Sequence, residues 1–258
     1  MFNVINWGID PTLVSLGPVE IRYYGLFFAL GFYAGYSIVL KRFREQGIDE
    51  KWLDKLFLFV GIATVLGARL GHVFFYDWAY YSENPGEILK IWRGGLASHG
   101  ATLAILFAAW LYAKRIGRSW LWVMDEVVYP ITFAGFCIRM GNFFNSEIIG
   151  LPSELPWAVV FENVDLIPRH PAQLYEAFSY LAMFFILKKV RWFDQAEGRK
   201  FGFVIFAIFT ARFIIEFVKE NQVAFEDQMT MNMGQWLSAP LIVFGAWLMY
   251  KAKLKHEK

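Results

Sequence analysis

Four arginines lie within or beside long apolar segments of this 258-residue chain, where charged side chains are rare. They are Arg22, Arg69, Arg139 and Arg212. A charge near the middle of a bilayer costs about 2.5–3.5 kcal/mol even on the mildest insertion scale, so something must compensate each one. A guanidinium group can hold two phosphate oxygens at once. An anionic lipid headgroup is therefore one candidate partner for these arginines.

A histidine and a glutamate could add to this chemistry. His99 lies in the small-residue segment GGLASHGATLA, and an imidazole can take or give a proton near neutral pH. Glu216 follows Arg212 by four residues, on the same face of a helix, so these two side chains could also simply neutralise each other. For both residues a structural and a chemical interpretation stay open at this point.

Composition excludes several classes of protein. The chain is 57% hydrophobic and 19% aromatic, which is more apolar than soluble domains usually are. Its net charge of +2 gives no sign of a nucleic-acid partner. The single cysteine, Cys137, excludes an intrachain disulfide and a multi-cysteine metal site, and we interpret it as a core residue. With no spaced set of His and Glu ligands either, we expect no metal and no cofactor.

Seven apolar segments are long enough to cross a bilayer, which takes about 20 residues. They lie near 19–40, 52–76, 96–113, 120–141, 170–187, 201–218 and 234–250. Most of the lysines and arginines between them fall in alternate loops and in the C-terminal tail, while the other loops hold only Lys90, Arg93, Arg169 and Lys219. Because basic residues concentrate on the cytoplasmic side, we expect an external N-terminus and a cytoplasmic C-terminus.

The fold class that follows is an all-α integral membrane protein with seven transmembrane helices. No linker or internal repeat is evident, so residues 1–258 are interpreted as one membrane domain. The longest external segment, 142–169, contains Gly150, Pro152, Pro156 and the alternating stretch WAVVF. This pattern predicts a small strand-bearing cap over the outer end of the helices.

In this orientation the polar side chains of the spans gather at their outer ends. Several alternatives are open for single members. Arg22 and Tyr23 could be interfacial anchors, Arg69 could pair with a glutamate, and His72 could be an interfacial aromatic residue. The outer set also contains Tyr24, His99, Arg139, Asn142, Gln173, Tyr175, Glu176, Arg212 and Glu216.

A spaced motif at 138–150, IRMGNFFNSEIIG, resembles the signature of the prolipoprotein diacylglyceryl transferase family, G-x-R-x-G-N-F-x-N-x-E-x-x-G. The matching residues are Arg139, Gly141, Asn142, Phe143, Asn145, Glu147 and Gly150. The resemblance extends over nearly the whole chain, because other blocks occur in the same order as in the family. These blocks are YYGLFFALGF, GARLGHVFFY, GGLASHG, RHPAQLYEA, ARFIIEF and MGQWLS.

Three positions depart from the family pattern. Cys137 stands where the signature has its first glycine, and Ala101 follows Gly100 where the family usually has a second glycine. Ile208 replaces a tyrosine that some members carry one turn before the arginine of the sixth span.

The resemblance implies transfer of the diacylglyceryl group of phosphatidylglycerol to the lipobox cysteine in the signal peptide of a preprolipoprotein. The products would be a thioether and glycerol phosphate, and the site would face the periplasm from the bacterial cytoplasmic membrane. Three residues are assigned to catalysis. His99 would be the base or proton relay, and Arg139 and Arg212 would bind the phosphate. Tyr24, Asn142 and Asn145 would bind the headgroup or orient the arginines. At the substrate site, Glu147 and Glu216 would fix the side chains of the arginines, and Gly150 would permit the chain reversal beneath the external cap. Supporting roles around this site are assigned to Arg69, Gln173, Tyr175 and Glu176.

Two other classes of function are weighed against this one. A transporter or flippase for anionic lipid would be expected to show repeats and broken helices near the midplane, with polar residues toward both faces. A membrane-embedded serine protease could use Ser98 and His99, but adjacent helical residues point about 100° apart and no G-x-S-x-G elbow is present. A peptide with a lipobox cysteine separates these activities, because only the transferase adds mass to it.

Overall fold

The computed structural model describes residues 5–17, 19–220, 226 and 229–252. These residues form two compact units. The first comprises residues up to 39 together with 127 onward, and the second comprises residues 40–126. The boundaries fall inside two helices, α1 (Tyr23–Glu45) and α5 (Trp120–Phe144), each of which continues from one unit into the other. The prediction of a single domain stays a prediction.

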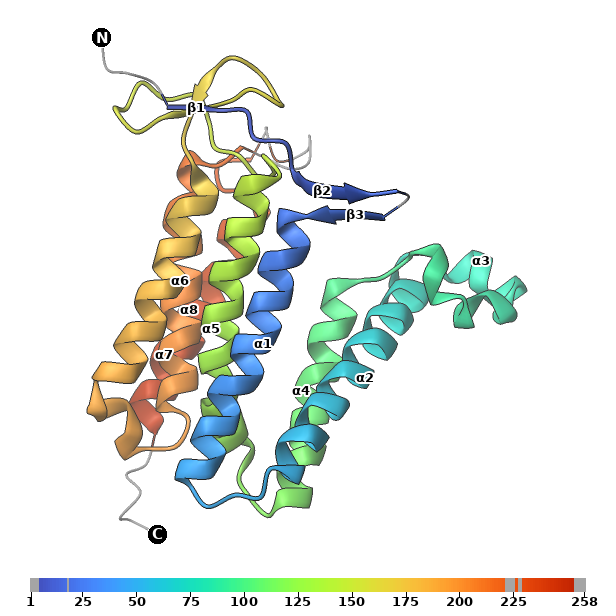
Figure 1. Ribbon diagram of the computed structural model, residues 1–258. Helices are drawn as coiled ribbons and strands as arrows, with labels where there is room; N and C mark the ends of the chain where they lie inside the picture. The colour runs from blue at the N-terminus through green and yellow to red at the C-terminus, as the bar shows by residue number, and fades with distance from the viewer. Residues whose placement is uncertain (1–4, 18, 221–225, 227–228, 253–258) are drawn as a thin grey trace. The chain divides into compact units, whose positions relative to one another are not determined.

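Each of the seven apolar segments contains one long helix (Figure 1). Besides α1 and α5, these are α2 (Lys51–Phe75), α4 (Ser98–Ile116), α6 (Ala172–Lys189), α7 (Arg199–Ile215) and α8 (Met233–Lys251). Their bounds lie within about three residues of the predicted ones, except that α1 begins and ends several residues later than predicted. The helical positions predicted from the sequence are therefore confirmed.

The protein is mostly helical and has the character of a membrane protein. Four helical segments of the described residues are long and apolar enough to cross a membrane, namely Tyr23–Glu45, Lys51–Phe75, Trp120–Phe144 and Arg199–Val218. A helix of about 20 residues is about 30 Å long, which is the thickness of the hydrocarbon layer. Residues 221–225 and 227–228 of one predicted external loop, and the lysines after residue 252, lie outside the described residues.

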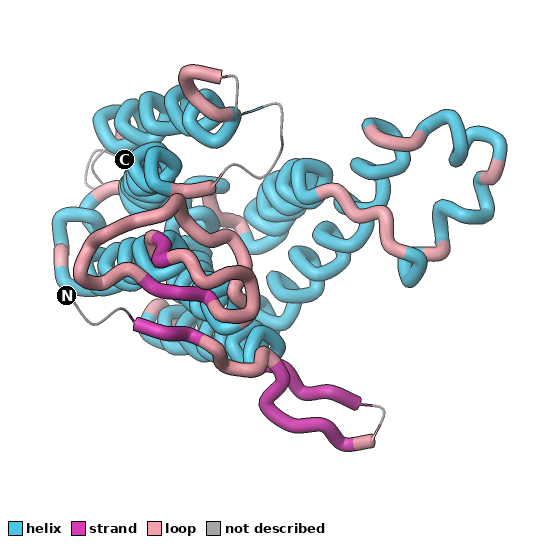
Figure 2. The backbone as a smooth tube through the Cα atoms, turned by 90° about the horizontal axis from the view of Figure 1, so that it is seen from above, coloured by secondary structure: helices cyan, strands magenta, loops and turns pink. Residues whose placement is uncertain are grey.

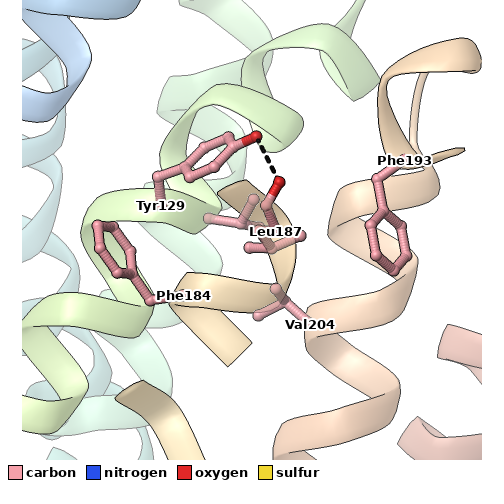
Figure 3. Close-up of a cluster of buried hydrophobic side chains, with 6 residues drawn as sticks. Tyr129, Phe184, Leu187, Phe193 and Val204 are labelled. Atoms are coloured by element: carbon pink, nitrogen blue, oxygen red, sulfur yellow. Dashed lines mark hydrogen bonds between the residues drawn. The ribbon is translucent and has the colours of Figure 1, made fainter. Parts of the chain in front are cut away.

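In the first unit, two kinds of helix packing are evident. At the crossing of α7 and α8 two glycines face each other, and a Cβ on Gly202 would lie 2.9 Å from the carbonyl oxygen of Gly245. Such small residues let membrane helices approach closely. Elsewhere apolar side chains fill the space between helices, and Figure 3 shows Tyr129 of α5, Phe184 and Leu187 of α6 and Val204 of α7 in one buried cluster. The Tyr129 hydroxyl also donates to the carbonyl oxygen of Leu187 at 3.4 Å.

One end of the first unit carries a small sheet, as seen in Figures 1 and 2. Its strand order is β1 (Ile5–Trp7), β4 (Val159–Phe161) and β5 (Pro168–Arg169), with β1 parallel to β4 and β5 antiparallel to it. The strands predicted within 142–169 are present as β4 and β5, and β4 falls within WAVVF. The contribution of the N-terminal strand β1 is a finding of the tertiary structure. A separate hairpin, β2 (Thr12–Leu16) with β3 (Val19–Arg22), precedes α1.

In the second unit, α2 and α4 cross at glycines. A Cβ on Gly71 would lie 2.7 Å from the Cα atom of Gly100, and one on Gly67 would lie 2.6 Å from the carbonyl oxygen of Gly100. The connection between these helices contains α3 (Trp78–Glu83) and the short 3-10 helices η1 (Pro85–Leu89) and η2 (Ile91–Arg93). The glycine contacts bring the last turns of α2 against the first turn of α4, in which His99 lies.

Candidate functional site

Arg139 lies near the C-terminal end of α5 and is held by two partners. Its Nε atom pairs with Oε2 of Glu176 on α6, whose side chain is only 3% exposed. Its Nη1 atom donates to Oδ1 of Asn142, one turn further along α5, at 3.1 Å. Because two separate nitrogens are engaged, the plane of the guanidinium group has a fixed orientation.

A strained turn follows α5 and fixes Glu147. The carboxylate accepts one hydrogen bond from Nδ2 of Asn142 at 2.9 Å and one from Nδ2 of Asn145 at 3.1 Å. Its neighbours Ser146 and Ile148 both have φ near +55°, a conformation that costs a non-glycine residue about 1–3 kcal/mol. Glu147 was expected to orient an arginine, and it contacts Arg139 through Asn142 rather than directly.

Arg212, on the last turns of α7, pairs with Glu216 at 3.4 Å. The Arg212 side chain stays 40% exposed, whereas Glu216 is buried. The other oxygen of Glu216 accepts from Nδ2 of Asn232 at 3.0 Å, and Asn232 is the N-cap of α8. A Cβ on Gly234 would lie 2.7 Å from Oε1 of Glu216. The glycine therefore lets the start of α8 approach the carboxylate.

Lys219 joins the two arginine–glutamate pairs. Its Nζ atom lies 3.1 Å from Oε1 of Glu216 and 3.6 Å from Oε1 of Glu176, and its side chain is only 4% exposed. The result is a chain of ion pairs that runs from Arg139 through Glu176, Lys219 and Glu216 to Arg212. In their charged forms these five groups carry a net charge of +1, which favours an anion beside them.

Two tyrosines pack against glycines of α5, the helix that carries Arg139. A Cβ on Gly141 would lie 2.8 Å from Cδ2 of Tyr24, so the glycine makes room for this ring from the first turn of α1. Gly135 does the same for Tyr180 of α6.

Gly150 has a different role from the predicted one. It was expected to permit the chain reversal, but the positive φ angles belong to Ser146 and Ile148. A Cβ on Gly150 would instead lie 2.5 Å from Cβ of His170 and 2.7 Å from the carbonyl oxygen of Val218. Gly150 thus allows three backbone segments to approach one another beside Lys219.

Gln173 and Tyr175, both on α6, lie beside the cap. Gln173 is almost fully buried, and its Nε2 atom donates to the carbonyl oxygen of Glu147 at 2.5 Å. The Tyr175 hydroxyl accepts from Nε1 of Trp157 at 2.8 Å and is 3.2 Å from Nδ1 of His170. Gln173 therefore supports the turn that carries Glu147, and Tyr175 ties α6 to the cap.

Arg69 belongs to the second unit, where it holds the connection between α2 and α4. It is buried, and its nitrogens donate to the backbone carbonyls of Glu87, Ile88, Gly94 and Gly95. Its guanidinium carbon also lies 4.9 Å from the ring centroid of Tyr81. Pairing with a glutamate side chain was one of the interpretations left open, and the observed partners are carbonyl dipoles instead. They hold the connection that leads into α4.

His99 is exposed in the first turn of α4. In the same unit His72 packs its ring 5.9 Å from that of Tyr76 and 6.1 Å from that of Tyr81, which agrees with the aromatic interpretation of His72. The Arg22 side chain is 58% exposed and pairs with Glu20 at 2.8 Å. Arg22 ends β3, before the first turn of α1, which explains its exposure.

Comparison with known proteins decides the family. The family model described as prolipoprotein diacylglyceryl transferase matches residues 11–251. A phosphatidylglycerol–prolipoprotein diacylglyceryl transferase of Chloroherpeton thalassium is 42% identical over 96% of this chain and 94% of its own length. One of Tolumonas auensis is 44% identical over 95% of this chain and 96% of its own, and one of Bacteroides fragilis is 41% identical over 95% and 94%. The chain belongs to the prolipoprotein diacylglyceryl transferase family.

The protein is thus a multi-pass membrane enzyme, a diacylglyceryl transferase of lipoprotein biosynthesis. Three residues in or beside the chain of ion pairs went unassigned in the sequence, namely Lys219, which belongs to it, and the uncharged Asn232 and Tyr180. Lys219 follows Glu216 by three residues, a helical spacing that could have indicated it. Asn232 precedes MGQ as a capping residue precedes a helix. Among the described residues, no group of three or more His, Cys, Asp or Glu is arranged to hold a metal ion.

Proposed function

We propose that this enzyme transfers the diacylglyceryl group of phosphatidylglycerol to the lipobox cysteine of a preprolipoprotein signal peptide. A bond forms between the cysteine sulfur and the glycerol carbon that carries the phosphate. The bond between that carbon and the phosphate oxygen breaks, and the electron pair leaves with glycerol phosphate. The thiol proton must go to a base, because the thiolate is the nucleophile.

The observation that carries this proposal is the chain of ion pairs between Arg139 and Arg212. A leaving phosphate gains negative charge as its bond to carbon breaks, and fixed cations stabilise that charge better than mobile water does. Glu176 and Asn142 fix Arg139, while Glu216 fixes Arg212. In this proposal each guanidinium binds phosphate oxygens, and the partial exposure of Arg212 keeps it accessible to a headgroup.

The other roles follow from residue chemistry. We assign His99 as the base or proton relay, since it is an exposed imidazole at the start of a helix. Tyr24, Asn142 and Asn145 are assigned to the glycerol headgroup and to the orientation of Arg139. Glu147, Gly150 and Gln173 support the turn after α5, Tyr175 supports the cap, and Arg69 supports the segment before His99.

The proposal includes the membrane arrangement. All seven long helices would span the bilayer as one membrane domain, with the N-terminus and the small cap on the periplasmic side and the C-terminus in the cytoplasm. The distribution of lysine and arginine between the loops supports this orientation. Both substrates are anchored in the bilayer, so the headgroup and the cysteine would meet at the depth of the outer leaflet.

The test uses purified protein, vesicles containing phosphatidylglycerol and a peptide with a lipobox cysteine. The expected result is a mass gain on the peptide equal to one diacylglyceryl group, with release of one glycerol phosphate per modified peptide. A peptide with serine in place of the cysteine is the control and should gain no mass. Movement of the lipid without a covalent product would overturn the proposal in favour of a flippase.

A further inference from the structure

Lys219 is a buried cation shared by two buried carboxylates that each hold an arginine. Its Nζ atom is 3.1 Å from Glu216 and 3.6 Å from Glu176. We infer that Lys219 is a positioning residue of the transferase, which couples the Arg139–Glu176 pair to the Arg212–Glu216 pair and so sets the two guanidinium groups for one phosphate. The inference rests on the proposed function, because it assigns the phosphate of phosphatidylglycerol to that arginine pair.

The backbone around Lys219 is fixed on both sides. The N–H of Leu151 donates to the carbonyl oxygen of Val218 at 2.9 Å, and the N–H of Glu220 donates to that of Ile149 at 3.2 Å. These two hydrogen bonds join the segment after α7 to the segment after α5, where Gly150 lies opposite Lys219 in a bridge. Because the backbone is held and the side chain is buried, the ammonium group has few alternative positions.

Charge explains why a cation is needed at this point. Without Lys219, the two arginines would face two carboxylates and the net charge of the group would fall from +1 to zero. Each carboxylate would then attract its arginine more strongly and compete with a phosphate for it. The ammonium group attracts both carboxylates at once and offsets part of their negative charge, so the potential around the two arginines stays positive. The site would bind an anionic headgroup less well without it.

Lys219 is separated from the proposed phosphate contacts by the two glutamates, and it acts through them. This distinguishes it from a group that touches the substrate. The loss of activity caused by replacing Lys219 should therefore be recovered in part when one of the two carboxylates is also neutralised. A purely structural role would show its recovery in the unfolding midpoint, because a neutral side chain relieves an uncompensated buried carboxylate, and would leave KM for phosphatidylglycerol unchanged.

The experiment measures kcat and KM for phosphatidylglycerol, together with the midpoint of thermal unfolding, in detergent-solubilised full-length enzyme. Lys219→Met should lower kcat/KM by about a hundredfold, the order of loss that a misplaced binding group produces. Lys219→Arg keeps the charge and should stay within about tenfold of the wild type. The double variant Lys219→Met/Glu216→Gln restores the net charge and should recover about tenfold relative to Lys219→Met.

Lys200 provides a matched control at the other end of α7. It is a lysine of the same side-chain exposure, 4%, and it pairs with Asp194 at 2.6 Å. Lys200→Met should lower the unfolding midpoint while leaving KM for phosphatidylglycerol near the wild-type value. If Lys219→Met loses no more activity than Lys200→Met, or if the double variant is no better than Lys219→Met, the inference is overturned.

A milder variant covers the case in which Lys219→Met does not fold. Lys219→Gln can still donate hydrogen bonds to both carboxylates but lacks the charge, so KM for phosphatidylglycerol should rise about fivefold or more. An unchanged KM in a folded Lys219→Gln enzyme overturns the inference. If the wild type itself makes no product, the proposed function fails. If the wild type works and Lys219→Met works equally well, this inference alone fails.

Discussion

Arg139, near the C-terminal end of α5, and Glu176, near the N-terminal end of α6, form an ion pair. The carboxylate is buried, so its attraction for the guanidinium is screened less by water than a surface pair would be. The Nε atom faces Glu176 and the Nη1 atom faces Asn142. The arginine is therefore oriented before any substrate arrives, which is what electrostatic stabilisation of a leaving phosphate requires.

Arg139→Ala should abolish the transfer of diacylglycerol, with a loss of about a thousandfold or more in kcat/KM. Folding should be largely retained, because Lys219 still contacts Glu176 when the arginine is gone. The measurement is product formation by mass spectrometry, together with the unfolding midpoint. Arg199→Ala is the control: Arg199 is buried against Trp192 at the other end of the helices, so its loss should affect stability rather than turnover. Full activity of Arg139→Ala would remove Arg139 from the site.

His99→Gln should suppress turnover more than lipid binding. Loss of a general base typically costs about 10²–10⁴ in rate, whereas glutamine keeps the polarity and much of the size of the side chain. The measurements are kcat for the lipobox peptide and equilibrium binding of phosphatidylglycerol to the same variant. His72→Gln provides a control from the same unit, since His72 packs on tyrosine rings. Equal losses of binding and turnover in His99→Gln would argue against a base.

Gly71→Ala should destabilise the second unit, because a Cβ there would lie 2.7 Å from the Cα atom of Gly100. Overpacking of this kind costs about 1–3 kcal/mol in the free energy of unfolding. Gly61→Ala is the matched control on α2, because no heavy atom lies within 4 Å of its Cβ position. It should stabilise the helix by up to about 1 kcal/mol. Thermal unfolding in detergent compares the two, and equal midpoints would contradict the crossing described here.

Acid should loosen the cap through Asp165. The hydrogen bond from Arg169 holds the pKa of this carboxyl below its usual value, with a smaller contribution from the N–H of Ile167. A depressed folded-state pKa means that the stabilisation is present above the ordinary pKa of aspartate and is lost as the pH falls through the lower folded value. Protease cleavage of the cap between about pH 5 and pH 2 measures this effect. The Asp165→Asn variant should be cleaved by the protease faster at neutral pH, and its cleavage rate should depend less on acid. A cleavage rate that depends on pH as in the wild type would count against the pairing of Asp165 with Arg169.

The helices could be predicted from the sequence because their signal is local. A run of about 20 apolar residues satisfies its own backbone hydrogen bonds only as a helix in lipid, so each predicted segment contains one long helix. The strand β4 was also predictable, from the alternation in WAVVF. Its partner β1 was not, because pairing between residues 5–7 and 159–161 depends on a tertiary contact that neither segment encodes alone.

The types of residue in the candidate site could be predicted from the sequence, but the contacts between their side chains could not. The motif spacing pointed to Arg139, Asn142 and Glu147, and helical periodicity linked Arg212 to Glu216. Periodicity could not show that Glu176 from another helix pairs with Arg139, or that Arg69 is held by backbone carbonyls. Nor could it show that Arg22 ends a strand and pairs with Glu20.

The amino-acid sequence by itself determined which stretches become helices, which family the spaced motif indicates and which residue types gather toward one end of the chain's helices. Only the tertiary structure decided how those residues are connected. Ion pairs between helices depend on how the helices cross, and those crossings depend on close glycine contacts such as Gly135 with Tyr180 and Gly202 with Gly245. A buried lysine could thus become the link between two arginines that are distant in sequence.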